Sequence, residues 1–167
     1  MSALSALLDA REERWLRRLA LSERGTLLTM TLNLPGPDKR LPRWLAFHRA
    51  IRLELERTLT NGNFAFTRVF SSVTASGPED HFLLSADAST LKRAMADFEE
   101  CHPGGRLADL DVMTHGKPVG REDLGLPPRL CLCCPRPAKE CAAQARHSLD
   151  EVLRAAERIL EAPPPSE

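Results

Sequence analysis

The order of six predicted elements between Thr26 and Val112 constrains the fold of this chain more than any other feature. Strand patterns have apolar and polar side chains in alternation, whereas helix patterns repeat apolar side chains every three to four residues. The predicted strands are 26–34, 64–73, 81–86 and a run ending at 112, and the predicted helices are 42–59 and 88–100, with a turn at 76–80. The first strand is expected to be half-buried. This strand–helix–strand–strand–helix–strand order predicts an α+β fold of the βαββαβ, ferredoxin-like split-sheet type.

The segments on either side of this core are predicted to add a helix before it and a cysteine-rich extension after it. Residues 2–19 show an apolar helical stripe of Leu4, Leu8, Trp15 and Leu19, and most of the surrounding arginines are expected on a solvated face. We predict one domain over 1–161, divided into the core 26–113, an Arg- and Pro-rich loop 114–130 with a turn at 115–118, and a cysteine cluster with a final helix from 139 in 131–161. Residues 162–167, which include Pro163-Pro164-Pro165, are predicted to be a disordered tail.

The amino-acid composition and net charge argue against nucleic acid as a partner. The chain has 167 residues, of which 43% are hydrophobic and 28% charged, as expected for a folded domain. Lys and Arg number 23 and so do Asp and Glu, and this zero net charge argues against the basic excess that nucleic-acid binding needs. Acidic residues such as Asp9 and Glu12 interrupt the N-terminal segment, so we expect no signal peptide, no membrane span and a cytoplasmic protein.

Two aspartates lie on the last predicted core strand. Asp109 and Asp111 are two apart, so both carboxylates project from one face while Leu110 and Val112 enter the core. Paired carboxylates of this kind hold divalent cations such as Mg²⁺. The ordinary alternative is an edge strand whose outer face is acidic.

Four of the five cysteines lie within eleven positions, which favours thiols or metal ligands over a disulfide framework. Cys131 and Cys134 form a C-x2-C pair, and Cys141 and His147 follow, so that three thiolates and one imidazole are available for Zn²⁺. Cys141 and His147 are six apart, and the geometry requires a helix that begins after Cys141. The alternative is a set of small buried thiols that pack a helical hairpin.

Together these motifs resemble one family, the citrate lyase holo-acyl-carrier-protein synthases, also called apo-citrate lyase phosphoribosyl-dephospho-CoA transferases. The matching pieces are Arg11-Glu12-Glu13-Arg14, Pro35-Gly36-Pro37 with Lys39, Ser76-Gly77-Pro78-Glu79, His102-Pro103-x-Gly105-Arg106-Leu107-x-Asp109-x-Asp111-Val112, Arg121-x-Asp123-x-x-Leu126-Pro127-Pro128-Arg129, and Cys131-Leu132-x-Cys134 with Ala138, Cys141 and His147. The resemblance covers about residues 8–155. The chain departs from the family pattern at Gly104, Leu130, Ala143 and the additional Cys133.

The resemblance implies a nucleotidyltransferase reaction. A serine on the acyl-carrier (gamma) subunit of citrate lyase would attack 2'-(5''-triphosphoribosyl)-3'-dephospho-CoA and release diphosphate. Asp109 and Asp111 would hold Mg²⁺, and Arg106 would be a further catalytic residue, a cation that binds the triphosphate. Either His102 or Glu79 would take the serine proton. The candidates for binding the anionic precursor are Arg11, Arg14, Lys39, Gly77, Arg121 and Arg129.

Two other functions remain open at this level. The βαββαβ order is also that of an RNA-recognition sheet, and Phe64, Phe66 and Phe70 on the second strand could stack bases. The third strand lacks the aromatic signature of that class. The second alternative is a non-catalytic adaptor that docks a lyase subunit through a zinc knuckle and the final helix.

Overall fold

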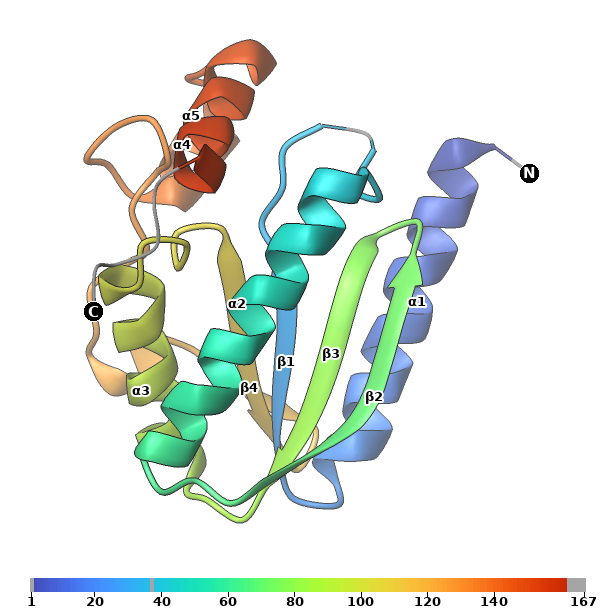
Figure 1. The fold of residues 1–167 in the computed structure, drawn as a ribbon, viewed down its shortest axis with the longest axis vertical. Helices are drawn as coiled ribbons and strands as arrows, with labels where there is room; N and C mark the ends of the chain where they lie inside the picture. The colour runs from blue at the N-terminus through green and yellow to red at the C-terminus, as the bar shows by residue number, and fades with distance from the viewer. Residues whose placement is uncertain (1, 37, 162–167) are drawn as a thin grey trace.

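A computed structural model describes residues 2–36 and 38–161 (Figure 1). The predicted Pro35-Gly36-Pro37 turn therefore falls partly, and the predicted tail 162–167 entirely, outside the described residues. The elements in chain order are α1 (Ala3–Ser22), β1 (Thr26–Leu32), α2 (Pro42–Asn61), β2 (Phe66–Thr74), β3 (Gly77–Leu84), α3 (Ala88–Cys101), β4 (Ala108–Thr114), β5 (Lys117–Val119), the 3-10 turn η1 (Glu122–Leu124), α4 (Ala138–Ala143) and α5 (Leu149–Glu161). The predicted order of strands and helices is confirmed, and the fold is α+β.

The five strands of the described residues form one antiparallel sheet in the order β2-β3-β1-β4-β5. The central strand β1 pairs with β3 on one side and with β4 on the other. Thr29 therefore stands opposite both His81 and Asp111, and Thr31 stands opposite Asp109. Because paired residues project from the same face, this register gathers polar side chains from three strands on one side of the sheet.

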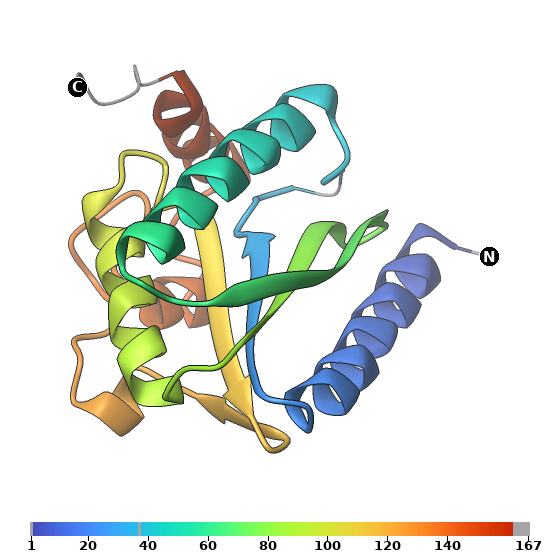
Figure 2. The ribbon, with the colours of Figure 1, turned by 60° about the horizontal axis from the view of Figure 1, so that its bottom comes forward.

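The main core lies between the other face of the sheet and helices α2 and α3 (Figure 2). Alternate residues of β1 and β4, including Met30 and Leu110, pack there against Leu55 and Met95 of the helices. The helix ends follow from local sequence. Asp87 caps α3 by accepting a hydrogen bond from Thr90 N at 2.7 Å, and Gly62 ends α2.

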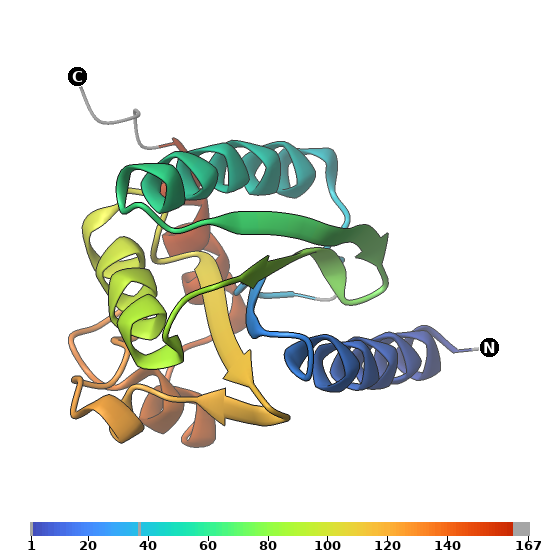
Figure 3. The same cartoon turned by 90° about the horizontal axis from the view of Figure 1, so that it is seen from below.

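Helix α1 covers the opposite face of the sheet (Figure 3). All seven residues of β1 are consequently buried, so the expectation of a half-buried first strand is wrong. The expected orientation of the α1 arginines is also wrong in part. Arg14, Arg17 and Arg18 point to the sheet and pair with its acids, while Leu4 and Trp15 of the apolar stripe stay exposed.

The predicted turn at 76–80 lies mostly within a strand, since β3 begins at Gly77 and only Ala75 and Ser76 make the reversal. Glu79 and Asp80 are buried in that strand because each acid faces a helix that supplies cations. Glu79 pairs with Arg14 and Arg17 of α1, and Asp80 lies 3.6 to 3.8 Å from His48 and Arg52 of α2 and from Arg68 of β2.

Two further corrections concern the C-terminal third. The predicted turn at 115–118 is a tight reversal at His115 and Gly116, both with positive φ, and Lys117 already belongs to β5. The predicted continuous helix from 139 is broken into α4 and α5. Ala145 has φ 43° at the break, and Arg146 N donates to Cys141 O, so the chain turns back before α5 starts. No helix in the described part of the chain is long and apolar enough to cross a membrane.

Candidate active site and cysteine–histidine cluster

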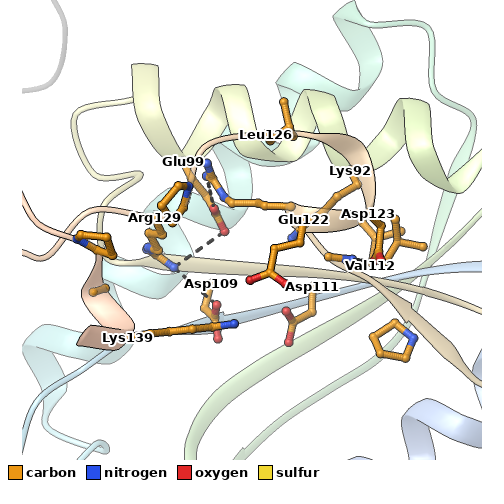
Figure 4. Close-up of a pocket in the computed structure, with 17 residues that line it drawn as sticks. Lys92, Glu99, Asp109, Asp111, Val112, Glu122, Asp123, Leu126, Arg129 and Lys139 are labelled. Atoms are coloured by element: carbon orange, nitrogen blue, oxygen red, sulfur yellow. Dashed lines mark hydrogen bonds and ion pairs between the residues drawn. The ribbon is translucent and has the colours of Figure 1, made fainter. Parts of the chain in front are cut away.

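Asp109 and Asp111 project together from β4, as their spacing predicts, into a pocket of about 490 Å³ (Figure 4). The side chains are 42% and 43% exposed, so solvent and ligands reach both carboxylates. Asp109 Oδ2 accepts from Thr31 Oγ1 at 3.3 Å, and Asp111 Oδ2 lies 3.0 Å from Arg18 Nη1. Desolvation together with the neighbouring Asp111 charge raises the pKa of the Asp109 carboxyl.

The walls of this pocket come from segments that follow the core. Residues of the Arg- and Pro-rich loop, from Gly120 to Arg129, line one side, and Pro137 to Lys139 at the start of α4 line another. Lys139 points into the same pocket as the aspartates (Figure 4). Segments that follow β4 in the chain therefore form the walls of the site.

Beside Asp109, β4 has an open edge, because β5 pairs only with residues 112–114. Side chains of α3 complete this edge. Lys92 Nζ donates to Leu110 O at 2.7 Å, and Glu99 Oε1 accepts from Leu110 N at 2.9 Å. Arg129 Nη2 donates to Arg106 O and Ala108 O, both at 2.6 Å. Side chains therefore replace a neighbouring strand here and leave the aspartate face free.

Arg129 and Arg121, both predicted to bind substrate, are held largely by protein groups. Arg129 Nη1 reaches Asp109 Oδ1 at 3.4 Å, while its Nη2 contacts the backbone carbonyls of the β4 edge. Arg121 pairs with Glu99 and Glu100 of α3, which anchors the Arg- and Pro-rich loop on that helix. Both arginines line the pocket, and their contacts with protein groups hold them in place there.

A second group of cations gathers near the pair. Burial lowers the pKa of Lys39, as do the charges of Arg11 and Arg14, whereas the charge of Asp109 raises it. Lys39 thus lies within electrostatic reach of two arginines and of the aspartate site. Gly77, with φ +97°, allows this approach, because a Cβ there would lie 3.1 Å from Lys39 Cβ. Arg14 is ion-paired with Glu79, so Lys39 and Arg11 are the cations left to favour an anionic ligand here.

Glu79 lies on the same sheet face but is fully engaged. It is 1% exposed and ion-pairs with Arg14 and with Arg17, which lies 2.7 Å from Oε1. Arg17 also stacks on the Phe70 ring at 3.8 Å. Ser72 Oγ donates to Glu79 Oε1 at 3.1 Å. The surroundings of Glu79 are those of a buried charge network that fixes α1 on the sheet.

His102 lies in the opposite layer from the aspartates. Its ring stacks on Phe98 with centroids 4.7 Å apart, and its Nδ1 accepts from Gly104 N at 3.1 Å. Gly104 itself packs under α2, where a Cβ would overlap Ile51 Cδ1. The structure does not bring His102 to the carboxylate pair.

Arg106 lies in the turn that precedes β4, directly after two glycines. Its guanidinium donates to the backbone carbonyls of Leu130 and Cys131. The charge therefore points to the cysteine segment, and Arg106 lines a separate, smaller pocket with Arg121 and Pro127.

Sequence reasoning missed several residues of the pocket and of the polar sheet face beside it. His81 is fully buried, its Nδ1 lies 2.9 Å from Thr29 Oγ1, and burial lowers its pKa to about 4. Arg18, Lys92 and Glu99 were also missed. The polar residues at alternate positions of 29–31 and 79–81 were the available signal, but the pairing of these strands is set only by the tertiary fold.

The side chains of Cys131, Cys134, Cys141 and His147 come together as predicted. One ligand atom from each lies within 4.8 Å of every other, with Cys134 Sγ 3.5 Å from Cys141 Sγ and 3.3 Å from His147 Nε2. Cys133 is outside this group, and all five cysteines are free thiols. The expected helix start after Cys141 holds for the final helix α5, which begins at Leu149, whereas Cys141 itself lies in the short helix α4.

Comparisons with known proteins agree on one family. The family model described as apo-citrate lyase phosphoribosyl-dephospho-CoA transferase matches residues 2–162. A probable apo-citrate lyase phosphoribosyl-dephospho-CoA transferase of Streptococcus pyogenes serotype M18 is 35% identical over 164 residues, covering 94% of this chain and 84% of the relative. The apo-citrate lyase phosphoribosyl-dephospho-CoA transferases of Shigella flexneri serotype 5b and Escherichia coli O1:K1 are each 35% identical over 155 residues, covering 91% of this chain and 81% of theirs.

Proposed function

Since the chain belongs to the apo-citrate lyase phosphoribosyl-dephospho-CoA transferase family, we propose that it loads a triphosphoribosyl-dephospho-CoA precursor onto the acyl-carrier subunit of apo-citrate lyase. The protein is an enzyme of the nucleotidyltransferase type. In the proposed reaction the carrier serine Oγ forms a bond to a phosphorus of the precursor, and the bond from that phosphorus to diphosphate breaks. The serine loses its proton, and a phosphodiester then joins the carrier to its prosthetic group.

The observation that carries this proposal is the Asp109 and Asp111 pair on one exposed strand face with cations around it. Arg18 lies 3.0 Å from Asp111, and Arg129 lies 3.4 Å from Asp109. Lys39 lies within reach of the Asp109 charge. A polyphosphate needs such cations, and a metal ion beside it needs such carboxylates.

We propose Mg²⁺ as the ion that Asp109 and Asp111 hold. The donor set fits, because both oxygen ligands leave the same face and remain accessible, and because a bound cation would oppose the desolvation and the Asp111 charge that raise the pKa of Asp109. When bound, the ion supplies charge neutralisation and orientation of the phosphate oxygens. The Thr31 hydroxyl and Arg129 hold the Asp109 side chain in place.

Lys39 and Arg11 are proposed to bind the leaving end of the triphosphate. The Arg14 guanidinium already contacts Glu79 and Ser76, so it is not free to bind the triphosphate. A phosphate between Lys39 and Arg11 would relieve the repulsion that lowers the Lys39 pKa. Gly77 would serve this site by allowing the Lys39 backbone to approach β3.

Neither candidate for the proton acceptor supports the proposal. Glu79 is buried with two arginines and Ser72 on its oxygens. His102 is stacked on Phe98 in the layer beyond the sheet. The proposal therefore rests on metal and phosphate binding, and it assigns no residue to the serine proton.

The two alternative functions have less support. The aromatic residues of an RNA-recognition sheet must stack bases on an open face, but Phe64 and Phe66 pack against the main core and Phe70 lies under Arg17. A non-catalytic adaptor would not need the aspartate pair in its pocket. We also infer a ferredoxin-like split-sheet class for the core, supported by the element order and by the antiparallel order β2-β3-β1-β4.

The test is to incubate the protein with apo-carrier, triphosphoribosyl-dephospho-CoA and Mg²⁺ and to follow the carrier mass and diphosphate release. Wild type is expected to add one prosthetic group per carrier with stoichiometric diphosphate. Asp109→Asn is expected to abolish this, whereas Asp97→Asn, the same change on the exposed face of α3, should leave it intact. An unmodified carrier with folded wild type and Mg²⁺ would contradict the proposed function and favour the adaptor.

A further inference from the structure

The cysteine–histidine cluster lies outside the proposed transfer site and has the dimensions of a metal centre. In a tetrahedral zinc site with Zn–S near 2.3 Å and Zn–N near 2.0 Å, neighbouring ligand atoms are about 3.5 to 3.8 Å apart. The four side chains, Cys131, Cys134, Cys141 and His147, place their ligand atoms within 4.8 Å of one another, and two pairs are at 3.5 and 3.3 Å. A small inward adjustment would bring all four atoms to one ion.

The backbone supports this arrangement from both sides. Residues 129–138 form a closed loop, in which Ala138 N donates to Arg129 O at 2.8 Å and Cys131 N donates to Arg136 O at 2.7 Å. Cys133 N points to Cys131 Sγ at 3.5 Å, as a backbone amide does beside a coordinated thiolate. Cys141 comes from α4, and the turn after α4 returns His147 to Cys134.

Neither a disulfide nor simple thiol packing accounts for the cluster as well as a metal ion does. A disulfide needs sulfur atoms about 2.05 Å apart, and Cys134 Sγ and Cys141 Sγ are 3.5 Å apart with both thiols free. Packed thiols would contact apolar carbon atoms and have no need of an imidazole nitrogen at the same point. The nearby thiol of Cys133, which such packing could also use, is left out of the group.

We propose that Cys131, Cys134, Cys141 and His147 bind one structural Zn²⁺ ion. The ion ties together the 129–138 loop, α4 and the turn before α5. Cys131 and Cys141 are 9% and 5% exposed, so two of the ligands are shielded from solvent. No ligand position is left for water, which is the composition of a structural rather than a catalytic zinc centre.

The zinc loop also adjoins the proposed active site. The loop begins at Arg129, whose guanidinium contacts Asp109, and its Cys131 carbonyl accepts a hydrogen bond from Arg106. The ion would therefore act as a positioning element that keeps Arg129 on the β4 edge. This positioning role rests on the proposed function, whereas metal binding itself does not.

The test begins with the full-length wild type, purified without chelators from zinc-sufficient cells. We expect about one zinc per chain by elemental analysis. After removal of zinc with a chelator, titration with Co²⁺ alone should produce the intense visible bands of tetrahedral cobalt and the near-ultraviolet thiolate-to-cobalt absorption. Zinc-free wild type that neither regains zinc nor gives this cobalt spectrum would overturn the proposal, as would iron or a Cys134–Cys141 disulfide in its place.

Matched variants locate the ligands. Cys134→Ser and His147→Ala are expected to lower the zinc content and to weaken or shift the cobalt bands. Cys133→Ser, one position from a ligand, and Cys101→Ser, on an exposed surface, should retain full metal content. If a ligand variant is insoluble, the chelation and cobalt titration of wild type still decide the question. Unchanged zinc in soluble Cys134→Ser and His147→Ala would refute this ligand set.

Zinc-loaded and zinc-free wild type also separate metal binding from the positioning role of the ion. Chelation is expected to reduce carrier loading at least tenfold, and added Zn²⁺ should restore it. Full loading by zinc-free protein would overturn the positioning role while leaving the metal site in place. Stoichiometric zinc in a protein with no transfer activity under any condition would instead contradict the proposed function.

Discussion

Arg18 of α1 and Asp111 of β4 form an ion pair of 3.0 Å that joins the outer helix to the carboxylate pair. Arg18 is 13% exposed, whereas Asp111 is 43% exposed. Arg18 thus pairs with one of two adjacent acids, whereas the other, Asp109, lies 3.4 Å from Arg129 and has a pKa raised by desolvation and by the Asp111 charge. The two aspartates should therefore differ in what they contribute to stability, although both are proposed to bind the same metal ion.

Asp109→Asn and Asp111→Asn should both lower transfer by about 100-fold or more, because each removes a charge proposed to hold Mg²⁺. Their effects on unfolding should diverge. Asp109→Asn removes repulsion within the pair and should leave stability unchanged or slightly raised. Asp111→Asn leaves Arg18 without its partner and should cost about 1 kcal/mol or less. Transfer rates and urea unfolding measure the two effects, and wild-type rates at saturating Mg²⁺ in either variant would contradict the assignment.

Lys39→Met should raise the KM for the precursor about tenfold or more with a smaller change in kcat, because a charge-assisted contact to phosphate contributes about 1.5 to 3 kcal/mol. Arg40→Met is the matched control, since Arg40 is exposed and its only ion pair, with Asp38, is 3.9 Å long among the described residues. Steady-state kinetics against precursor concentration measure the effect. Equal KM values for the two variants would remove Lys39 from the phosphate site.

Glu79→Gln should destabilise the protein by about 3 kcal/mol, because it leaves Arg14 and Arg17 facing a buried neutral group. Arg17→Lys should cost about 1 kcal/mol, since Lys keeps the charge but loses the stacking on Phe70. The sequence alone predicts no effect of this second change, because it places Arg17 on a solvated face. Denaturant unfolding measures both, with Glu54→Gln on the surface of α2 expected to change stability by less than about 0.5 kcal/mol.

Acid should destabilise the fold through His81. Burial lowers its folded-state pKa from 6.5 to about 4, with Glu79 opposing the shift and Arg14, Arg17 and Arg18 adding to it. Between these values the unfolded chain takes up a proton that the folded protein does not, so stability falls as the pH drops through this window. Wild type should lose about 2 kcal/mol more than His81→Gln between pH 7 and pH 5.

Unfolding curves at the two pH values test this. The comparison with His81→Gln isolates His81 from His48, whose pKa is also lowered by burial and which is present in both proteins. Parallel losses in the two proteins would show that His81 does not titrate in this window.

The features predicted correctly from the sequence depend on neighbouring residues. Asp109 and Asp111 share a face because alternation along a strand is local, and Leu110 enters the core for the same reason. Helices α2 and α3 begin at the predicted residues, Pro42 and Ala88, because the helical spacing of apolar side chains is likewise local. The C-x2-C spacing identified a metal-ligand candidate before any fold was known.

What only the tertiary structure decided depends on partners far apart in the chain. An arginine on α1 is a surface residue unless a buried acid such as Glu79 faces it, and that acid is tolerated in β3 only because α1 covers it. The approach of His147 to Cys134, across the helix α4 that lies between them in the chain, is likewise visible only in the tertiary structure. Local sequence determines which helices and strands form. Which residues make the site depends on contacts between elements, in which buried acids find arginines and thiols find a histidine.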